Sequence, residues 1–513
     1  MTLPNLLLLL SALAGLAFIA SILALRSYNR FADRARGPVV MSLPRGNTDT
    51  PIDSMIDPVQ AANPGLNGLA NLIDPKDAFA ARSLSAMAAG RSLDVITYIW
   101  STDTSGWLLM ADVLAAADRG VRVRLLLDDV NVQGFDLAFL GLTQHRNIEI
   151  RLFNPIRNRG HWLRRAAEFA LGLSRFNRRM HGKVWIVDGR LAILGGRNIG
   201  DTYFGAPGSG ARLSQDADMI LVGPKLDDVS AVFDSFWNMG LSLPILTLWP
   251  RFRINDKRFR RRLARHASAP IASAFRKQAI AGRSAADMLA TPLRWTDDVT
   301  LLADPPDKAL GRRKGPWLLD GIADVMSNAR SRVRMTTPYL VPGNEGLALL
   351  TTLARRGVTV QILTNALAAT DLFSVHAAYT HYRPPLLAAG AALFEFAPPR
   401  RGLRKRDLLH SKVFLIDDDR ALVGSHNFDM RSAYINIEMG LLFREPTLVA
   451  ELGELFDRQT NPATSFAVTS EGGHLYWTQT ENGQTTRLSY EPEASAFRRI
   501  ASWVIARLPH GWF

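Results

Sequence analysis

The sequence predicts an α/β protein whose single chain forms two pseudo-symmetric sandwich halves, with the active site at their interface and a hydrophobic helix in front of them. Two observations predict the halves: apolar, β-rich runs alternate with helical segments, and the same succession of segments occurs twice. A third observation, a long uncharged run near the N-terminus, predicts the helix.

The composition excludes several classes of protein. A hydrophobic content of 47% with 21% charged residues excludes a disordered tail and a collagen-like fibre. The absence of Cys excludes disulfides, thiolate zinc sites, iron–sulfur clusters and a cysteine nucleophile, although it says nothing about the compartment. The excess of 61 Lys+Arg over 47 Asp+Glu, a formal charge of +14, favours an anionic partner such as phospholipid or nucleic acid.

Residues 1–30 are predicted to form an N-terminal membrane anchor. The run from Leu6 to Leu25 carries no charge, and about 20 residues at 1.5 Å each span a bilayer core of roughly 30 Å. A cleaved signal peptide is one alternative, but it needs a basic segment before the run; a buried core helix is another. Basic residues instead follow the run, which places the body of the protein on the cytoplasmic side. They are Arg26, Arg30, Arg34 and Arg36.

Two segments are predicted to connect the main parts of the chain. Residues 31–75 are rich in Pro, Gly, Asn and Asp without a sustained period, which predicts a linker. Residues 246–300 form a basic connecting segment with two interpretations. Its arginines form a solvated face, or, because aromatic residues lie among them, they form a surface that rests on anionic lipid headgroups. These aromatic residues are Trp249, Phe252 and Phe259.

The C-terminal segment, residues 461–513, is predicted to contain a hairpin and an amphipathic helix. Asn482 and Gly483 form the expected turn of the hairpin. Residues 494–508 place apolar side chains at helical spacing opposite arginines. The apolar face either packs on the core of the protein or inserts into a membrane interface.

The internal repeat defines the two halves, residues 76–245 and 301–460. In each half a β-rich run comes first, then a helix end with a Gly cap and an apolar strand, then a strand that ends at Pro, and last a polar motif. The matched segments are 91–100 with 331–340, 117–129 with 354–366, 148–155 with 391–399, and 181–198 with 410–427. Each half alone is too thin to enclose a site, so the site is expected between them.

The polar motif has the same pattern in both copies, H-x-K-x4-D-x6-G-[GS]-x-N. The first copy is His181, Lys183, Asp188, Gly195, Gly196 and Asn198; the second is His410, Lys412, Asp417, Gly424, Ser425 and Asn427. A period of two along the strand places each His and Lys on one face. A lone strand histidine is more often structural, but only 9 of the 61 basic residues are Lys. Two matches in register therefore indicate function.

These residue types suit transfer of a phosphoryl group. One histidine can attack phosphorus while the other protonates the leaving alcohol, and a lysine ammonium is a point charge for a phosphoryl oxygen. An acidic partner fixes each histidine tautomer, with Asp218 and Glu438 as candidates. No set of metal ligands at chelating spacing is evident in the sequence, so no metal or other cofactor is expected. Asp188 and Asp417 either transfer protons or, the favoured interpretation, cap the turn after the strand.

The repeated motif resembles the paired HKD motifs of the phospholipase D superfamily, over most of residues 80–460. Within that superfamily the sequence is most similar to the bacterial C-type cardiolipin synthases. The strings that carry this closer resemblance are YIWSTDTSG (98–106), FNRRMHGK (176–183), GGRNIGDTYF (195–204), TTPYLVP (336–342) and GSHNFDMRSAYINIE (424–438). One departure is Gly196, where the superfamily usually has Ser, although the C type shares the change.

The resemblance implies a phospholipase D-like fold and metal-free phosphatidyl transfer at a bacterial inner membrane. His181 would form a phosphatidyl-histidine, and His410 would act first as acid and then as base. The residues that would bind the substrate phosphate are Lys183, Lys412, Asn198, Asn427, Gly196 and Ser425, while Asp218 and Glu438 would orient the histidines. The implied donor is phosphatidylethanolamine or phosphatidylglycerol, the implied acceptor is phosphatidylglycerol, and the product is cardiolipin.

Other functions stay open at this point. A phospholipase D that hydrolyses lipids to phosphatidic acid has the same motifs, and the choice depends on how the site excludes water. A nuclease of the same superfamily would bind DNA in a strongly salt-dependent way, but the apolar N-terminal run argues against nucleic acid as the partner. A lipid-binding scaffold with an inactive site conflicts with two complete motifs. An anionic membrane surface remains the expected partner.

Overall fold

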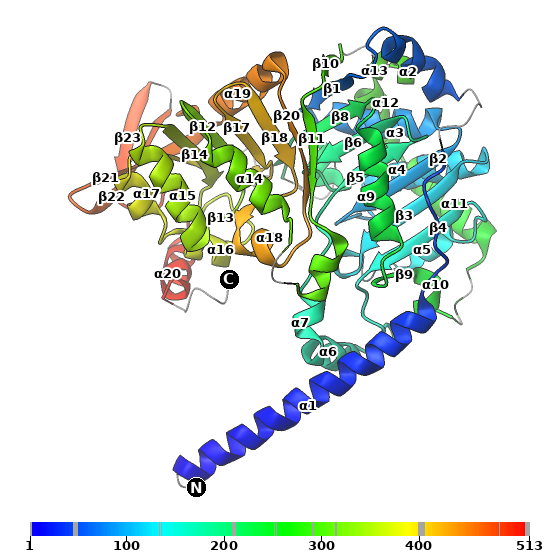
Figure 1. The fold of residues 1–513 in the computed structure, drawn as a ribbon, viewed down its shortest axis with the longest axis horizontal. Coiled ribbons are helices and arrows are strands. Elements are labelled where there is room, and N and C mark those ends of the chain that lie inside the picture. Colours follow the sequence, from blue (N-terminus) through cyan, green and yellow to red (C-terminus); the bar gives the residue numbers. More distant parts are fainter. Residues whose placement is uncertain are drawn as a thin grey trace.

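Two large β-sheets lie side by side and form the cores of the two halves (Figure 1). The computed structural model describes residues 3–44, 50–132, 134, 136–207, 212–250, 252, 254–289, 292–312, 315–398, 406–481 and 483–507. Helices cover both sheets, so the predicted α/β class with two similar halves is confirmed.

The first sheet has nine strands. Its strands β2, β3 and β4 run parallel to one another, whereas β5, β6 and β8 pair antiparallel. Across the sheet the order is β10 (Arg294–Thr296), β1 (Asn67–Leu72), β8 (Asp218–Val222), β6 (Leu191–Gly195), β5 (Val184–Val187), β2 (Ser92–Thr97), β3 (Arg122–Asp128), β4 (Ile148–Phe153) and β9 (Ser242–Pro244).

The second sheet has ten strands and repeats this arrangement. Its strands β12, β14 and β15 are parallel, and β17, β18 and β20 are antiparallel. The order is β11 (Val299–Ala303), β20 (Met439–Phe443), β18 (Arg420–Gly424), β17 (Val413–Ile416), β12 (Arg332–Thr336), β14 (Thr359–Asn365), β15 (Ala392–Phe396), β21 (Ser465–Glu471), β22 (His474–Glu481) and β23 (Gln484–Leu488). The predicted duplication is therefore a duplication of topology.

Helices lie on both faces of each sheet, and one apolar core joins the halves. The first sheet packs against α3 (Pro75–Ala88), α4 (Thr104–Asp118), α11 (Asp256–Ala267) and α12 (Pro270–Ile280) on one face and α9 (Leu226–Trp237) on the other. The second sheet packs against α14 (Leu318–Ser327), α15 (Gly343–Arg355) and α17 (Arg383–Ala388) on one face and α19 (Pro446–Gln459) on the other. A shared cluster includes Met219 and Phe233 of the first half and Leu441 and Leu448 of the second.

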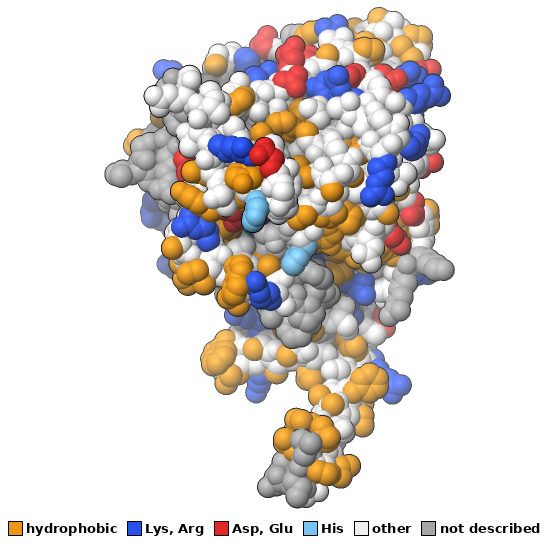
Figure 2. Space-filling model, turned by 90° about the vertical axis from the view of Figure 1, so that its left-hand side faces the viewer, with side chains coloured by type: hydrophobic (Ala, Val, Ile, Leu, Met, Phe, Trp, Pro, Cys, Tyr) orange, Lys and Arg blue, Asp and Glu red, His pale blue; other side chains and the backbone are white. Residues whose placement is uncertain are grey.

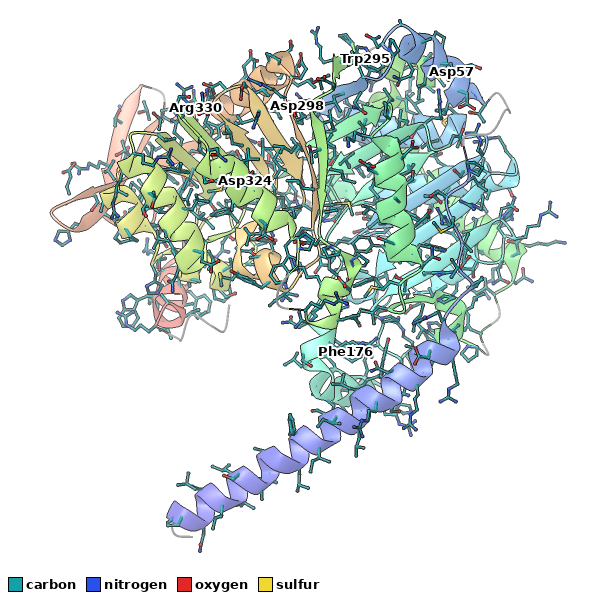
Figure 3. The ribbon with its side chains drawn as sticks, viewed as in Figure 1. Asp57, Phe176, Trp295, Asp298, Asp324 and Arg330 are labelled. Carbon is teal, nitrogen blue, oxygen red and sulfur yellow. The ribbon has the colours of Figure 1, made fainter. Side chains whose placement is uncertain are left out.

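Helix α1 (Leu3–Ala35) projects from the body, and among the described residues it is the one helix long and apolar enough to cross a membrane. Its C-terminal end is fixed to the first half. Tyr28 is buried, donates a hydrogen bond from its hydroxyl to the Pro155 carbonyl oxygen, and packs edge-on against Phe176 at 5.4 Å. Figure 3 shows Phe176 at this junction, between the body and α1.

The predicted linker at residues 31–75 is wrong in part, because it contains regular structure. Helix α2 (Pro51–Ala61) begins with Thr50 as N-cap and Pro51 in the first turn. Asp53 completes a capping box with Thr50. Strand β1 then pairs with β8 and becomes part of the first sheet. The polar and Pro-rich composition therefore marked a helix start and a short strand.

The basic connecting segment lies against the first half. Phe259 and Leu263 of α11 are buried, and Trp249 and Phe252 pack on the same core. The aromatic side chains therefore face inward, which removes the basis for a lipid-binding surface here and leaves the solvated-face interpretation. Arg260 makes one of the surface ion pairs, with Asp118 at 2.9 Å.

The C-terminal segment extends the second half. Strands β21, β22 and β23 add an antiparallel meander to the edge of the second sheet, and Glu481 pairs with Gln484 across the hairpin. Asn482 of the predicted turn and residues 508–513 lie outside the described residues. Helix α20 (Ala496–Ile505) follows and packs against α16 (Phe373–Tyr379).

Candidate functional site

The two motif histidines lie at the interface of the halves, just before the central strands β5 and β17. The His181 backbone N–H donates to the Ile437 carbonyl oxygen of the other half at 2.8 Å. In the same way the His410 N–H donates to the Gln215 carbonyl oxygen at 2.7 Å. Both histidines are buried. The interface itself therefore fixes the start of each motif.

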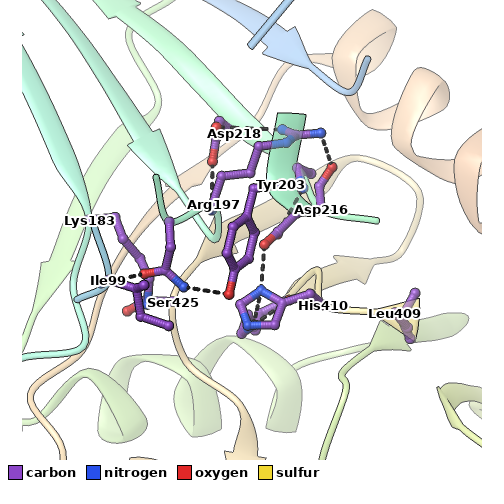
Figure 4. A network of polar contacts seen from close by, with 12 residues as sticks. Ile99, Lys183, Arg197, Tyr203, Asp216, Asp218, Leu409, His410 and Ser425 are labelled. Carbon is purple, nitrogen blue, oxygen red and sulfur yellow. Dashed lines mark hydrogen bonds and ion pairs between the residues drawn. The ribbon is translucent and has the colours of Figure 1, made fainter. Parts of the chain in front are cut away.

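Each histidine side chain contacts a carboxylate from the opposite half. His181 Nδ1 lies 2.8 Å from Glu438 Oε2, and His410 Nδ1 lies 2.6 Å from Asp216 Oδ2. Figure 4 shows the second pair, with Asp216 directed at the His410 ring. A carboxylate at this distance holds the proton on Nδ1. In each ring Nε2 then carries the lone pair, and it is the nitrogen that can attack phosphorus or accept a proton.

The prediction that Asp218 orients a histidine is wrong, because Asp216 does so. Asp218 lies in a buried ion-pair cluster instead, 2.9 Å from Arg82 Nη2 and 3.5 Å from Arg197 Nη1. Strand register explains the error. Gly195 pairs with Asp218 in the first half, and Gly424 pairs with Gly440 in the second. The residues two positions earlier, Asp216 and Glu438, are therefore the equivalent pair.

Replacing Asp218 should affect stability. Asp218→Asn leaves the buried guanidinium groups of Arg82 and Arg197 without their carboxylate, and breaking a buried ion pair costs roughly 3–5 kcal/mol. Denaturant unfolding measures this loss. The control is Asp228→Asn in α9, an exposed partner of Lys225, for which we expect a change of about 0–1 kcal/mol. If the two substitutions lower the free energy of unfolding equally, the buried cluster contributes no more to stability than an exposed ion pair.

Lys183 and Lys412 are buried in the same small volume as the histidines. Each ammonium donates to the carbonyl oxygen of the histidine two residues before it. Burial lowers the pKa of Lys183 to about 7; Glu438 opposes this shift, and the charge of Lys412 adds to it. Burial lowers the pKa of Lys412 as well. Two ammonium groups crowded together out of water form a site that an anion stabilises.

Electrostatics favour neutral imidazoles facing ionised carboxylates. Burial lowers the pKa of His181 to about 4, although Glu438 raises it. Burial also lowers the pKa of His410. For Asp216 burial opposes ionisation, but His410 and Lys412 outweigh it and lower the pKa to about 2. His181 and Lys183 likewise hold the pKa of Glu438 well below its usual range. A neutral imidazole is the form that can attack phosphorus.

Gly196 and Ser425, predicted to contact the substrate phosphate, lie against the two carboxylates that contact the histidines. The Ser425 hydroxyl donates to Glu438 Oε2 at 2.5 Å. At the matching position of the first half, a Cβ on Gly196 would overlap the Asp216 carboxylate. The departure from Ser therefore has a steric cause, because Asp216 already occupies that space.

The two motif asparagines differ in their surroundings. Asn198 accepts a hydrogen bond from the Ile99 N–H at 3.1 Å and donates one to the Tyr203 hydroxyl at 3.0 Å, so its amide is engaged with the protein at both ends. Asn427 is buried, and its Oδ1 has no hydrogen-bond partner among the described residues. Of the two, Asn427 is the one whose amide oxygen can still accept a hydrogen bond from a ligand.

Asp188 and Asp417, included among the candidate catalytic residues, lie at the far ends of β5 and β17. The Asp188 carboxylate accepts N–H groups of residues 90–92, and Asp417 accepts those of residues 330–332. Each aspartate lies seven positions after its histidine along largely extended chain, a distance of about 20 Å. This placement rules out direct proton transfer to phosphate and supports a structural role. The predicted cap on the turn after the strand is wrong in its partner, because the carboxylates bind the backbone at the start of the neighbouring strands β2 and β12.

Two tyrosines of the site were not assigned from the sequence. Tyr98 packs edge-on against His181 with ring centroids 4.8 Å apart, and Tyr203 packs in the same way against His410 at 5.2 Å. Burial raises the pKa of both tyrosines above the usual value. The two tyrosines therefore stay protonated, and each packs against the ring of one histidine. Both lie in strings that carried the family resemblance, YIWS and DTYF, which was the available signal.

Comparisons with known proteins find related sequences over most of the chain. A family model described as "Cardiolipin synthase, PLD-like domain" matches residues 85–237 and 322–460. Cardiolipin synthase C of Escherichia coli (strain K12) is 36% identical over 483 residues, which cover 90% of this chain and 98% of that protein. Cardiolipin synthase 1 of Bacillus cereus is 26% identical over 367 residues, 72% of this chain and 61% of that one.

Among solved structures, the phosphatidylserine synthase of Haemophilus influenzae has a similar fold. The TM-score is 0.57 at 14% sequence identity, and the match covers 88% of this chain and 96% of that one. At this identity the likeness concerns the fold alone.

Proposed function

Because the chain belongs to the cardiolipin synthase family of phospholipase D-like proteins, we propose that it makes cardiolipin through a phosphatidyl-histidine, without a metal ion. It is a phosphatidyltransferase of the phospholipase D superfamily that acts on phospholipids. One observation supports the mechanism most. Two neutral histidines each contact a carboxylate of the other half, and a buried lysine lies beside each of them.

In the first step His181 Nε2 attacks the phosphorus of the donor lipid. A P–N bond forms, the P–O bond to the headgroup breaks, and His410 gives its proton to the departing headgroup alcohol. In the second step His410 takes the proton from the hydroxyl of the acceptor. The acceptor oxygen bonds to phosphorus, the P–N bond breaks, and cardiolipin leaves.

The protonation states follow from the charges of the site. His181 is neutral in the free enzyme at pH 7, as a nucleophile must be. Burial also lowers the pKa of His410, yet His410 must be protonated to act as the acid of the first step. The substrate phosphate brings a negative charge, which favours the protonated form of a nearby histidine. Lys183 and Lys412 would hold the non-bridging oxygens.

The proposed donor is phosphatidylethanolamine or phosphatidylglycerol, and the proposed acceptor is phosphatidylglycerol. The relatives support the product, since several are cardiolipin synthases. The chain is a membrane-anchored bacterial protein with one N-terminal apolar helix. We place its catalytic body on the cytoplasmic face, because arginines follow the apolar run.

A lipid product assay tests the function. Purified full-length protein in mixed micelles receives headgroup-labelled phosphatidylethanolamine and phosphatidylglycerol, separately and together, with and without EDTA. We expect cardiolipin, free headgroup alcohol and no effect of EDTA. Phosphatidic acid as the product would identify a hydrolase. Loss of turnover in EDTA, restored by a divalent cation, would contradict the metal-free mechanism.

A further inference from the structure

Exposed apolar side chains gather on two helical segments near the site. Outside α1, most large apolar residues that are exposed in the described part of the chain are scattered singly, as on any soluble protein. Two groups are not. The first is on α6 (Trp162–Leu171) and α7 (Leu173–Phe176) and consists of Trp162, Leu163, Phe169 and Leu173; the second is on α20 and consists of Phe497, Ile500, Trp503 and Val504.

Helix α20 presents its apolar face outward. Phe497 is 78% exposed, Ile500 63% and Trp503 60%, and their spacing places them on one side of the helix. The opposite, polar side faces the body. Ser502 is the buried residue of the helix, and Arg498 donates to the Thr370 carbonyl oxygen at 2.8 Å. A helix that only packed on its own core would have the reverse arrangement.

The neighbouring surface of the second half adds to this face. Leu372 and Phe373, at the start of α16, are also exposed, and α16 packs against α20. Arg507 lies over the Trp503 ring at 3.3 Å, and Arg499 lies over Tyr490. Aromatic residues with arginines beside them are typical of segments at the boundary between headgroups and acyl chains.

Helix α6 has the same character in the first half. None of its residues is buried, and Trp162 is 69% exposed. It packs beside α1, the candidate membrane span. In the stretch 157–179, Arg164 is exposed and the side chain of Arg157 is 40% exposed. The side chains of two other arginines of the stretch, Arg159 and Arg179, are buried in ion pairs with the first half. A membrane with anionic lipids therefore complements both the apolar and the charged side chains of this segment.

Both groups adjoin the active site. The α6–α7 segment leads into His181, and the Asn177 side chain accepts a hydrogen bond from Arg431 of α18 (Met430–Tyr434), at 2.7 Å. On the other side, Asp371 directly precedes Leu372 and lies near enough to Lys412 of the site for its charge to oppose the lowering of the pKa of that lysine by burial. Figure 1 shows α1, α6, α7 and α20 along the lower side of the molecule, and in Figure 2 hydrophobic side chains gather towards the lower edge of the body.

We propose that α6–α7 and α20, with Leu372 and Phe373, form a two-part surface that inserts into the interfacial region of an anionic phospholipid bilayer on either side of the active site. This inference rests on the proposed function, since an enzyme that takes both substrates from a bilayer needs its site held against it. Helix α1 alone attaches the body to the bilayer at one place, through the first half. Two further contacts fix its orientation.

The absence of Cys from the sequence allows a clean test. Single cysteines are placed on the proposed surface by Ile500→Cys and Leu163→Cys, and labelled with a polarity-sensitive fluorophore. The controls are Ile271→Cys of α12 and Met87→Cys of α3, which are exposed at 47% and 51%. Helices α3 and α12 lie in the upper part of Figure 1. The labelled full-length proteins are reconstituted into vesicles of phosphatidylethanolamine and phosphatidylglycerol, with and without brominated lipid.

We expect a blue shift and quenching by brominated lipid at positions 500 and 163, and neither effect at 271 and 87. Equal, water-like fluorescence at all four positions would overturn the proposal. A blue shift at 500 and 163 without quenching by brominated lipid would also overturn it, because it indicates a contact with protein and not with lipid. Cardiolipin formation is measured on the same samples. If cardiolipin is formed while the labels at 500 and 163 are not quenched, the proposed membrane surface is overturned and the proposed function stands. If the labels are quenched but no lipid is turned over, the membrane surface is supported and the proposed function is overturned.

Discussion

His181→Ala should abolish phospholipid turnover. His410→Ala should stop the enzyme after its first step, provided that the donor lipid has a leaving group that departs without being protonated. Loss of the nucleophile in a covalent mechanism lowers kcat by roughly 10⁴-fold or more. His410 has a different task, since it protonates the headgroup and later activates the acceptor. A phosphatidyl donor with a nitrophenol leaving group bypasses the first of these tasks but not the second.

The measurement is a burst of nitrophenolate followed by mass analysis of the protein. His410→Ala should release about one nitrophenolate per active site and retain a phosphatidyl group on His181, because the second step lacks its base. His181→Ala should give no burst. The control is His474→Ala, an exposed histidine of β22, which should keep the rate of the unmodified enzyme.

The roles of the two histidines are tested separately by the same samples. The geometry around them is nearly symmetric, since each has a carboxylate, a lysine and an edge-on tyrosine. A phosphatidyl group found on His410 in the His181→Ala protein would exchange the assigned roles. Full activity of His181→Ala would contradict the covalent mechanism itself.

The repeat made the fold and the centre of the site predictable. Matching segments in register imply matching topology, and period two along HGKVWIV and HSKVFLI implies that each His and Lys share a strand face. A strand of the same kind in each half then brings His181 and His410 together at the interface. No single segment carries this information, because a strand histidine alone is usually structural.

The partner of His410 was less predictable, since it depends on strand register. The stretch QDADM offers two aspartates two residues apart, both on one face of the extended chain. Only the pairing of Gly195 with Asp218, set beside that of Gly424 with Gly440, shows which aspartate matches Glu438. Aligning the first residues of the strands that follow, MILV (219–222) and LLF (441–443), was the signal in the sequence that points to Asp216, because Asp216 and Glu438 each lie three positions before them.

The segments around the halves were predicted less well for a related reason. Strand β1 consists of NGLANL, which has too little alternation to stand out, yet it is buried because β8 and β10 flank it. In the basic segment the arginines dominate the composition while a few apolar residues, such as Phe259, determine the packing. Tertiary partners that are distant in sequence decided both cases.

Asp216→Asn and Glu438→Gln should each lower kcat by about 10²–10⁴-fold while the fold is retained. Both substitutions keep the shape of the side chain but replace the acceptor that fixes the proton on Nδ1, and the loss of such a carboxylate costs up to about 10⁴ in kcat. Glu454→Gln, an exposed residue of α19, is the control. Unchanged unfolding curves exclude a merely structural effect.

The pH profile separates this role from packing. His181 must be neutral to attack, and its pKa is about 4, so kcat/KM should fall as the pH drops through about 4. The Glu438 carboxylate raises the pKa of His181. Glu438→Gln should therefore move the acid limb to still lower pH while it lowers the rate, whereas a packing defect would lower the rate at every pH and leave the limb in place.

The serine next to Glu438 provides a graded version of the same test. Ser425→Ala removes the hydroxyl that donates to Glu438 Oε2, and should weaken the orientation of the carboxylate without removing its charge. Its rate should fall between those of Glu438→Gln and the unmodified enzyme, with an unmoved acid limb. If Glu438→Gln retains full activity, the interface carboxylates only stabilise the contact between the halves, and the histidines are oriented by the backbone and the tyrosines.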